Sequence, residues 1–205
     1  MIKKITLAIV LAFYTNACFS QEFNYSVGVN ACRVKYDFTY LKESNSYVNP
    51  EMVSDTFNLR KLTVGPSFRT WYSHEFGESL KLITGIEGTV GLIPGNGSLT
   101  NGFFIDLPIF VGGEYDINNR ISVFSTIGGS YDFLVGYYEI HSVFGNIEFG
   151  TSFDLDGDFL IFKLRFGKLL YQPYSDYFPF QEKDVTKYRA GILNVGLSYL
   201  FKSTN

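Results

Sequence analysis

The residues best suited to catalysis are His141 and Ser142, with Glu139 two positions before the histidine. A histidine beside a hydroxyl and a carboxylate can activate the hydroxyl as a nucleophile for acyl transfer. This chemistry requires both side chains to converge on one point, whereas neighbouring residues of a β-strand point to opposite faces. We therefore expect a polar loop end here and predict no catalytic residue.

A second group of interest is Asp154, Asp156 and Asp158, whose spacing around Gly157 is that of the start of a calcium-binding loop. Such a loop needs a bidentate glutamate at its twelfth position, where Arg165 stands. Asp-Gly between two extended segments is instead the sequence of a type I′ hairpin. We predict a tight turn and no metal site.

The N-terminus predicts a cleaved signal peptide over residues 1–20, followed by a single domain over 21–205. Lys3 and Lys4 precede an apolar run that is too short for a transmembrane helix, and Cys18-Phe19-Ser20 is an acceptable cleavage site. One alternative is a buried N-terminal helix. Another is lipidation of Cys18, although Thr15 stands where a lipidation signal normally has leucine.

Composition excludes several classes of protein. The net charge of −3 gives no electrostatic footprint for nucleic acid. With the signal peptide removed, Cys32 is the only cysteine, so neither an internal disulfide nor a cysteine-based zinc site can form. The run from Gly95 to Ser98 has no following lysine and is expected to be a loop, not a phosphate cradle. We predict no cofactor.

The dominant pattern after the signal peptide is a period of two, which indicates β-strands. Each predicted strand is long enough for a tilted crossing of a bilayer, which needs about 9–11 residues. The eight segments are 22–32, 59–72, 79–92, 103–115, 121–133, 143–154, 159–171 and 193–201.

The connections between these segments alternate in length. Residues 73–78, 116–120 and 155–158 form short turns, and the Asn118-Asn119 pair tolerates positive φ. Longer polar stretches lie between them, at about 37–58, 93–102, 134–142 and 172–186. This alternation predicts an eight-stranded antiparallel up-and-down transmembrane β-barrel in the outer membrane, with both termini periplasmic.

Glycine indicates which face of the strands is inside, because eight strands enclose a narrow lumen. Most strand glycines fall on the polar face, as expected if that face lines the lumen, with Gly88, Gly113, Gly129 and Gly145 on the other side. The glycines on the polar face are Gly28, Gly65, Gly85, Gly112, Gly128, Gly150, Gly167 and Gly196.

The polar face carries too few charges for a water-exposed surface, which suits an interior where opposite charges pair. For Asp106 and Glu114, the candidate partners are Arg69, Lys163 and Arg165. The full set on this face is Lys61, Arg69, Glu87, Asp106, Glu114, Asp132, Glu148, Lys163 and Arg165.

The other face forms continuous apolar rows, which would promote aggregation in water but suit lipid. Two rows are Leu82, Ile86, Val90, Leu92 and Leu160, Phe162, Leu164, Phe166. Tyrosines near strand ends, at 72, 115, 131, 171 and 199, fit interfacial girdles. Pro66 and Pro108 interrupt strands, so we expect a bulge or lost ladder hydrogen bonds at each.

The run Asp106-Leu107-Pro108-Ile109, followed by an Asn-rich turn and a Gly-rich strand, resembles the PorT-like outer-membrane β-barrel domain of Gram-negative bacteria. The last strand, Gly196 to Phe201, is similar to the aromatic-ended closing strand of such barrels. In the wider class that strand is recognised by the barrel-assembly machinery; here residues 202–205 follow it. The resemblance implies no catalytic residues.

We therefore predict a monomeric, lipid-embedded barrel without an open pore, whose role is structural or depends on its outer loops. Aromatic residues between prolines make the 171–186 loop the candidate contact for an extracellular partner or glycan, unless they cap the barrel mouth. His74 is expected to be a solvated turn residue. The alternatives are a lipid-modifying enzyme of the lipid A deacylase or acyltransferase kind, and a soluble periplasmic lipocalin-like barrel with its apolar face inside.

Overall fold

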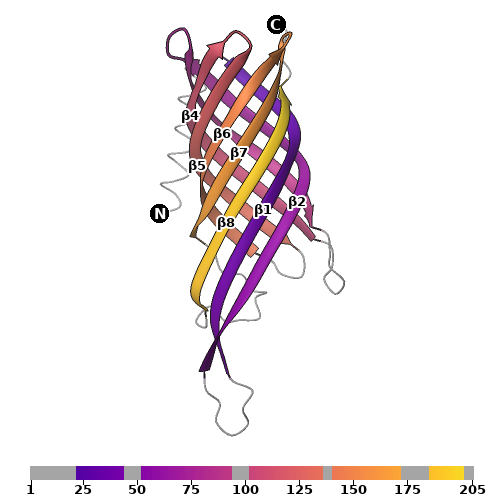
Figure 1. The fold of residues 1–205 in the computed structure, drawn as a ribbon, viewed down its shortest axis with the longest axis vertical. Helices are drawn as coiled ribbons and strands as arrows, with labels where there is room; N and C mark the ends of the chain where they lie inside the picture. The colour runs from indigo at the N-terminus through magenta and orange to yellow at the C-terminus, as the bar shows by residue number, and fades with distance from the viewer. Residues whose placement is uncertain (1–21, 44–51, 94–101, 136–139, 172–184, 201–205) are drawn as a thin grey trace.

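The computed structural model describes residues 22–43, 52–93, 102–135, 140–171 and 185–200, and within 38–43, 52–59 and 185–188 only the backbone is described. These residues form eight antiparallel strands in a closed barrel, each hydrogen-bonded to its sequence neighbours, with β1 pairing β8 (Figure 1). The strands are β1 (Glu22–Glu43), β2 (Met52–Glu75), β3 (Leu80–Ile93), β4 (Gly102–Asn118), β5 (Ile121–Val135), β6 (Ile140–Leu155), β7 (Asp158–Tyr171) and β8 (Val185–Leu200). The described part of the chain contains no helix with the length and hydropathy to cross a membrane.

The barrel has two unlike ends. The connections β2–β3, β4–β5 and β6–β7 lie at one end, called the turn end below, together with Glu22 and Leu200. The opposite end of the barrel, where β1, β3, β5 and β7 end and β2, β4, β6 and β8 begin, is called the loop end. The predicted fold class and strand order are confirmed.

The long β1–β2 hairpin corrects the predicted strand limits. The 37–58 segment was predicted as a loop, but the pairing of β1 with β2 continues without a shift to Glu43↔Met52. This hairpin projects beyond the rest of the barrel at the loop end (Figure 1). The prediction failed because backbone pairing between two strands does not require the apolar alternation on which the strand limits were based. For the same reason β8 starts at Val185, and β5 and β6 take in parts of the predicted 134–142 loop, up to Val135 and from Ile140.

Two of the turns show how the sequence reverses the chain. Asp156 and Gly157 both have positive φ, 59° and 112°, which confirms the predicted type I′ hairpin. The β4–β5 turn works differently, because the Asn118 side chain accepts hydrogen bonds from the backbone N–H groups of Arg120 at 2.8 Å and Ile121 at 2.9 Å. The positive φ that the Asn118-Asn119 pair would tolerate does not occur in this turn. Among the described non-glycine residues, only Asp156 has a positive φ.

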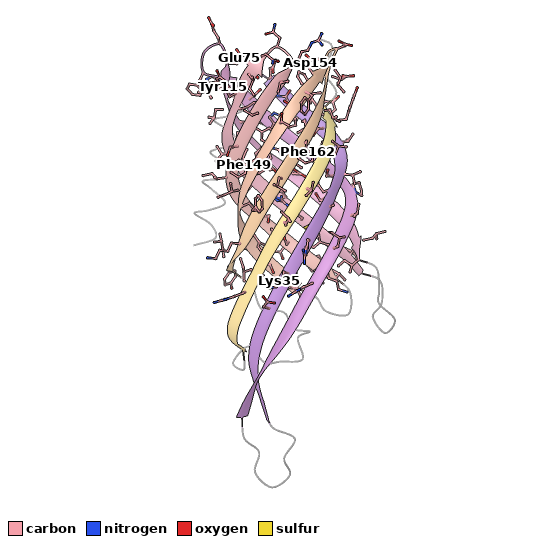
Figure 2. All side chains as sticks on the ribbon, in the orientation of Figure 1. Lys35, Glu75, Tyr115, Phe149, Asp154 and Phe162 are labelled. Carbon is pink, nitrogen blue, oxygen red and sulfur yellow. The ribbon has the colours of Figure 1, made fainter. Side chains whose placement is uncertain are left out.

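Outward and inward side chains separate as predicted. Phe162 and Leu197 on the outer face are 47% and 50% exposed, whereas the ionic side chains of Glu87, Lys163 and Arg165 are buried inside. Phe149 and Phe162 lie midway along the outer wall, between Glu75 and Asp154 at the turn end and Lys35 towards the loop end (Figure 2). An apolar exterior around an ionic interior is the arrangement of a transmembrane barrel.

The inner glycines allow the strands to enclose so narrow a space. A Cβ added at Gly65 or Gly128 would collide with the backbone of the neighbouring strand. On the outer face, by contrast, a Cβ at Gly113 would find its nearest neighbour, the Lys81 carbonyl oxygen, 3.9 Å away. The predicted preference of glycine for the lumen is therefore steric.

The two strand prolines disturb pairing without shifting it. Pairing with β3 is absent at 65–66 of β2 and at 107–108 of β4, and the register is the same on both sides of each gap. Pro66 and Pro108 therefore each cost ladder hydrogen bonds towards β3, which was one of the two predicted outcomes, and neither introduces a bulge.

We predict that Gly128→Ala destabilises the folded barrel by about 1–3 kcal/mol, because its methyl group must displace the backbone of β4. Gly113→Ala, on the outer face, should change the stability by less than about 0.5 kcal/mol. The fraction of folded, heat-modifiable protein against urea concentration measures both. Equal effects of the two substitutions would contradict this account of the lumen.

Candidate functional site

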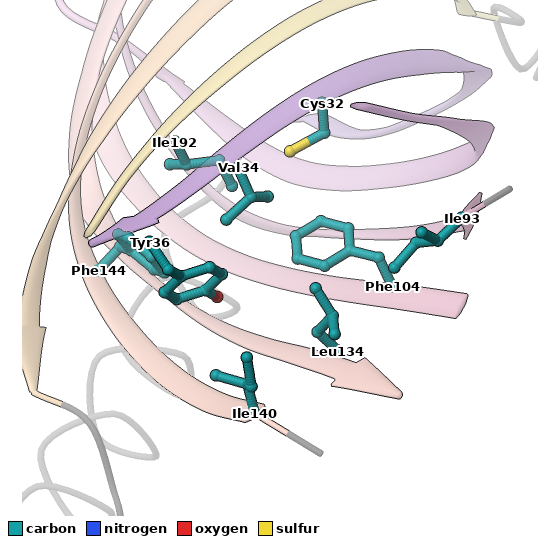
Figure 3. Close-up of a cluster of buried hydrophobic side chains, with 9 residues drawn as sticks. All are labelled: Cys32, Val34, Tyr36, Ile93, Phe104, Leu134, Ile140, Phe144 and Ile192. Carbon is teal, nitrogen blue, oxygen red and sulfur yellow. The ribbon is translucent and has the colours of Figure 1, made fainter. Parts of the chain in front are cut away.

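The lumen is filled in three layers. An apolar layer lies towards the loop end (Figure 3) and consists of Cys32, Val34, Tyr36, Ile93, Phe104, Leu134, Ile140, Phe144 and Ile192. A second apolar layer lies towards the turn end and consists of Trp71, Ile83, Phe110, Phe124, Ile161 and Leu200. The order along β4 shows what separates them, since Asp106 lies between Phe104 and Phe110 on the inner face. The middle layer is ionic.

The two apolar layers are the main part of the interior that the sequence prediction missed. It assigned the polar face to the lumen and did not assign the large aromatics that share that face. The alternation of side chains along each strand could have predicted them, because residues an even number of positions apart share a face. Trp71 lies two positions from Arg69, and Phe104 and Phe110 lie two and four positions from Asp106. These side chains are buried together with the ions.

Arg69 is the centre of one half of the ionic layer. Its Nη1 lies 2.6 Å from Glu148 Oε1 and 3.6 Å from Glu87 Oε2. Lys163 forms an ion pair with the same Glu87, and Asn30 Nδ2 donates to Glu87 Oε1 at 2.6 Å. The guanidinium of Arg69 also lies 4.0 Å from the centre of the Phe110 ring, in cation–π contact. Arg69 thus joins the ionic layer to the turn-end apolar layer.

Asp106, Asp132 and Arg165 form the other half. Arg165, one of the three candidate partners predicted for Asp106, forms an ion pair with it. Asp132 is the direct cross-strand neighbour of Asp106 on β5, and none of the ion pairs described for this structure includes it. Both Asp132 carboxylate oxygens are buried without a hydrogen-bond donor among the described residues.

The formal charges of this layer do not balance. Arg69, Lys163 and Arg165 face four buried carboxylates, those of Glu87, Asp106, Asp132 and Glu148. Removing one member of a buried ion pair costs several kcal/mol, because the other charge is left without compensation. Asp132 is the carboxyl group of this layer for which no ion pair is described.

No ion pair is described between Glu114 and any of its predicted partners, Arg69, Lys163 and Arg165. Glu114 lies nearer the turn end of β4 than Phe110 and lines a hollow there together with Arg69. Its Oε1 instead accepts a hydrogen bond from Ser122 Oγ at 2.7 Å. The alternation of side chains along a strand determines which face a residue lies on. It does not determine which residues of distant strands lie at the same level of the barrel axis.

A small hollow opens at the turn end. Its volume is about 90 Å³, and Glu22, Lys81, Glu114 and Asp116 are among the polar residues that line it, with an ion pair of 3.2 Å between Lys81 Nζ and Asp116 Oδ2. Arg69 and the turn-end aromatics lie at its base. The volume is well below the roughly 300–1,000 Å³ of typical small-molecule sites.

The structure separates the residues considered for catalysis. His141 lies on the outer face of β6, where Nδ1 contacts the Tyr131 hydroxyl and the ring lies 4.5 Å from that of Phe133. Ser142 points inward, and its Oγ donates to the Tyr36 hydroxyl at 3.3 Å. The predicted divergence of these neighbours is confirmed, while Glu139 lies outside the described residues.

The residues considered for calcium form a turn. Asp154 Oδ1 accepts from the Gly157 N–H at 2.7 Å, and Asp158 accepts from the Tyr199 hydroxyl. The described residues contain no group of side chains with the composition of a metal site. His74 lies at the end of β2, not in the turn, and packs edge-on against Phe76 at 5.1 Å. Residues 172–184 of the predicted contact loop lie outside the described residues.

Comparison with known proteins supports the fold. No family model matches the chain, and a search of curated proteins found no match. Among solved structures, Neisserial surface protein A is 12% identical with a TM-score of 0.50, over 88% of this chain and 100% of that one. The attachment invasion locus protein Ail of Yersinia pestis is 14% identical (85% and 99% covered, TM-score 0.42). The outer membrane protease OmpT of Escherichia coli is 9% identical (89% and 97%, TM-score 0.43). At these identities the likeness concerns the fold alone.

The unequal roles of the two facing aspartates can be tested. We predict that Asp106→Asn destabilises the barrel by about 3 kcal/mol, because it removes the carboxylate paired with buried Arg165. The isosteric control, Asp132→Asn, should be neutral or stabilising, because it replaces a buried carboxyl group that forms no described ion pair. Urea unfolding in lipid vesicles measures both.

The double variant shows whether Asp132 takes over Arg165 when Asp106 is neutral. If Asp132 does so, the double variant loses more stability than the sum of the losses measured for Asp106→Asn and Asp132→Asn alone. A larger loss for Asp132→Asn than for Asp106→Asn would contradict the assignment of the ion pair.

Proposed function

We propose that this protein is a small, PorT-like, monomeric barrel of the bacterial outer membrane, with a structural role or an interaction role exerted from its loop end. The observation that carries the proposal is the filled lumen. Described side chains of the ionic and apolar layers fill the interior, which supports a barrel without an open pore. What the protein does must then involve its outer surfaces.

The outer wall supports residence in lipid. Large exposed hydrophobic side chains occur on every strand, for example Val29, Leu62, Ile127 and Phe166. The shortest strands have 14 residues, enough to cross a bilayer at a tilt. A soluble lipocalin-like barrel would place these side chains inside instead.

The orientation follows from the unlike ends. Outer-membrane barrels have short periplasmic turns and longer outer loops, so the turn end would face the periplasm. Glu22 and Leu200 both lie at that end, which supports two periplasmic termini after removal of residues 1–20. The closing strand β8 would then be presented to the barrel-assembly machinery during insertion.

A non-enzymatic role is supported by the separation of His141 and Ser142. The imidazole lies on the lipid-facing side and the hydroxyl inside the barrel, so the pair cannot act on one substrate atom in this arrangement.

The membrane proposal predicts that the folded protein stays in the membrane fraction in carbonate and changes its gel mobility on heating. In planar bilayers it should give no stepwise conductance, since the layered lumen leaves no water-filled path. A trimeric porin is the positive control. Release by carbonate would favour a soluble barrel, and discrete conductance steps would refute the closed lumen.

The interaction role predicts that a photo-crosslinker in the β1–β2 hairpin or in residues 172–184 captures an extracellular protein or glycan on intact cells. The matched control is a crosslinker at Glu78, in the β2–β3 turn. It should capture only periplasmic molecules. The same products from both ends would refute the proposed orientation, and no product from the loop end would leave the structural role as the better account.

A further inference from the structure

The outer wall carries a concentration of positive charge near the loop end. Five exposed cations lie on the outward face of four consecutive strands, β7, β8, β1 and β2, and are called the basic patch here. They are Arg33, Lys35, Arg60, Lys168 and Arg189.

The strand register shows that these residues are neighbours. Lys168 pairs with Gly191, Gly191 pairs with Lys35, and Lys35 pairs with Arg60, so they form one row across the barrel wall. With adjacent strands about 4.8 Å apart, the backbone positions of this row span roughly 15 Å. Arg33 lies two residues along β1 from Lys35, on the same face.

The patch has little internal compensation. Asp37 forms an ion pair of 2.6 Å with Lys35 and is the direct cross-strand neighbour of Arg189. It is the one carboxylate among the described side chains that lie at this level of the four strands. Lys35 and Arg60 are directly opposite each other, and like charges in this position destabilise a sheet unless an anion lies between them.

The patch lies at the edge of the apolar wall. Arg33 pairs with Leu62, which is 60% exposed, and Val64 follows it on the same face. On β8, Val195 and Leu197 continue the apolar wall towards the turn end. A lipid with an anionic headgroup could therefore place the headgroup against the basic patch and its acyl chains against the adjacent apolar wall.

The other half of the barrel differs at the same level. There the outward residues of β4, β5 and β6 are uncharged, apart from His141, and include two contacting pairs, Phe103 with Phe133 and His141 with Tyr131. The basic patch is thus a one-sided feature of the wall and not a uniform ring of interfacial lysines and arginines.

We propose that the basic patch binds the phosphate groups of anionic lipids in the loop-end leaflet, with the acyl chains lying along Leu62, Val64 and Val195. This inference rests on the proposed residence in a membrane. The guanidinium of Arg60 offers a bidentate fork for phosphate oxygens, and the Lys168 ammonium adds a second charge in the same row. Such a site would collect phosphorylated lipid on one side of the barrel.

The test uses the folded full-length barrel in phosphatidylcholine vesicles at low salt, with spin-labelled phosphatidylglycerol as the probe and spin-labelled phosphatidylcholine as the reference. The wild-type protein should associate preferentially with the anionic probe. Arg60→Gln and Lys168→Gln should each weaken that association by up to about five-fold, and the double variant should show almost no preference. Arg120→Gln, an exposed cation at the turn end, is the matched control and should keep it.

The heat-dependent gel shift establishes that each variant is folded before its lipid preference is compared. A folded barrel with equal association for both probes, or an unchanged preference in the double variant, would overturn the lipid site. Inorganic phosphate, added to the same phosphatidylcholine vesicles with their spin-labelled probes, distinguishes the source of the anion. If millimolar phosphate binds the patch and abolishes the preference for the phosphatidylglycerol probe, the site is one for soluble phosphate. Failure of the protein to insert would instead count against the proposed function.

Discussion

The width of an eight-stranded barrel is the constraint on which the rest of the structure depends. Strands this close leave no room for bulk water, so every inward side chain must fit against the opposite wall or be glycine. Gly65 and Gly128 meet the backbone of neighbouring strands so closely that no side chain fits. The same constraint forces charged side chains into contact with one another, because water cannot solvate them. The ion pairs of Arg69 and Arg165 follow from that geometry.

The apolar layers on both sides of the ions complete this interior. They exclude water from the ionic layer, which strengthens the attraction between opposite charges and also raises the cost of any unpaired one. The contact of Arg69 with Phe110 shows how the layers meet without a gap. A barrel packed in this way is a rigid support, and its interior has no described space for a ligand beyond the small hollow at the turn end.

Sequence alone predicted the features that depend on alternation. The face of each strand and the type I′ turn at Asp156 followed from parity and residue type, which also limited the candidate partners of Asp106 to three cations, including Arg165. The β1–β2 hairpin was not predicted, because backbone pairing between two strands does not require the apolar alternation on which the strand limits were based. The environment of Glu114 and the aromatic layers were missed because they depend on the register between strands, that is, on how far each strand is shifted along the barrel axis. The sequence pattern of one strand does not determine that shift. The same dependence hid the basic patch, whose members come from four strands and become neighbours only through the register.

A sealed lumen shifts attention from the inside of the barrel to its wall. In a membrane the apolar part of that wall is satisfied by any lipid, so it contributes stability without selectivity. Selectivity can arise only where the wall departs from uniform apolar character, and the described residues do so on one side, where Lys35 directly faces Arg60. Opposing cations on an exposed face reduce stability unless an anion is present. Asp37 already pairs with Lys35. Under the proposed membrane residence, the phosphate of an anionic lipid would compensate the cations that remain, such as Arg60, and this side of the wall would be its selective surface.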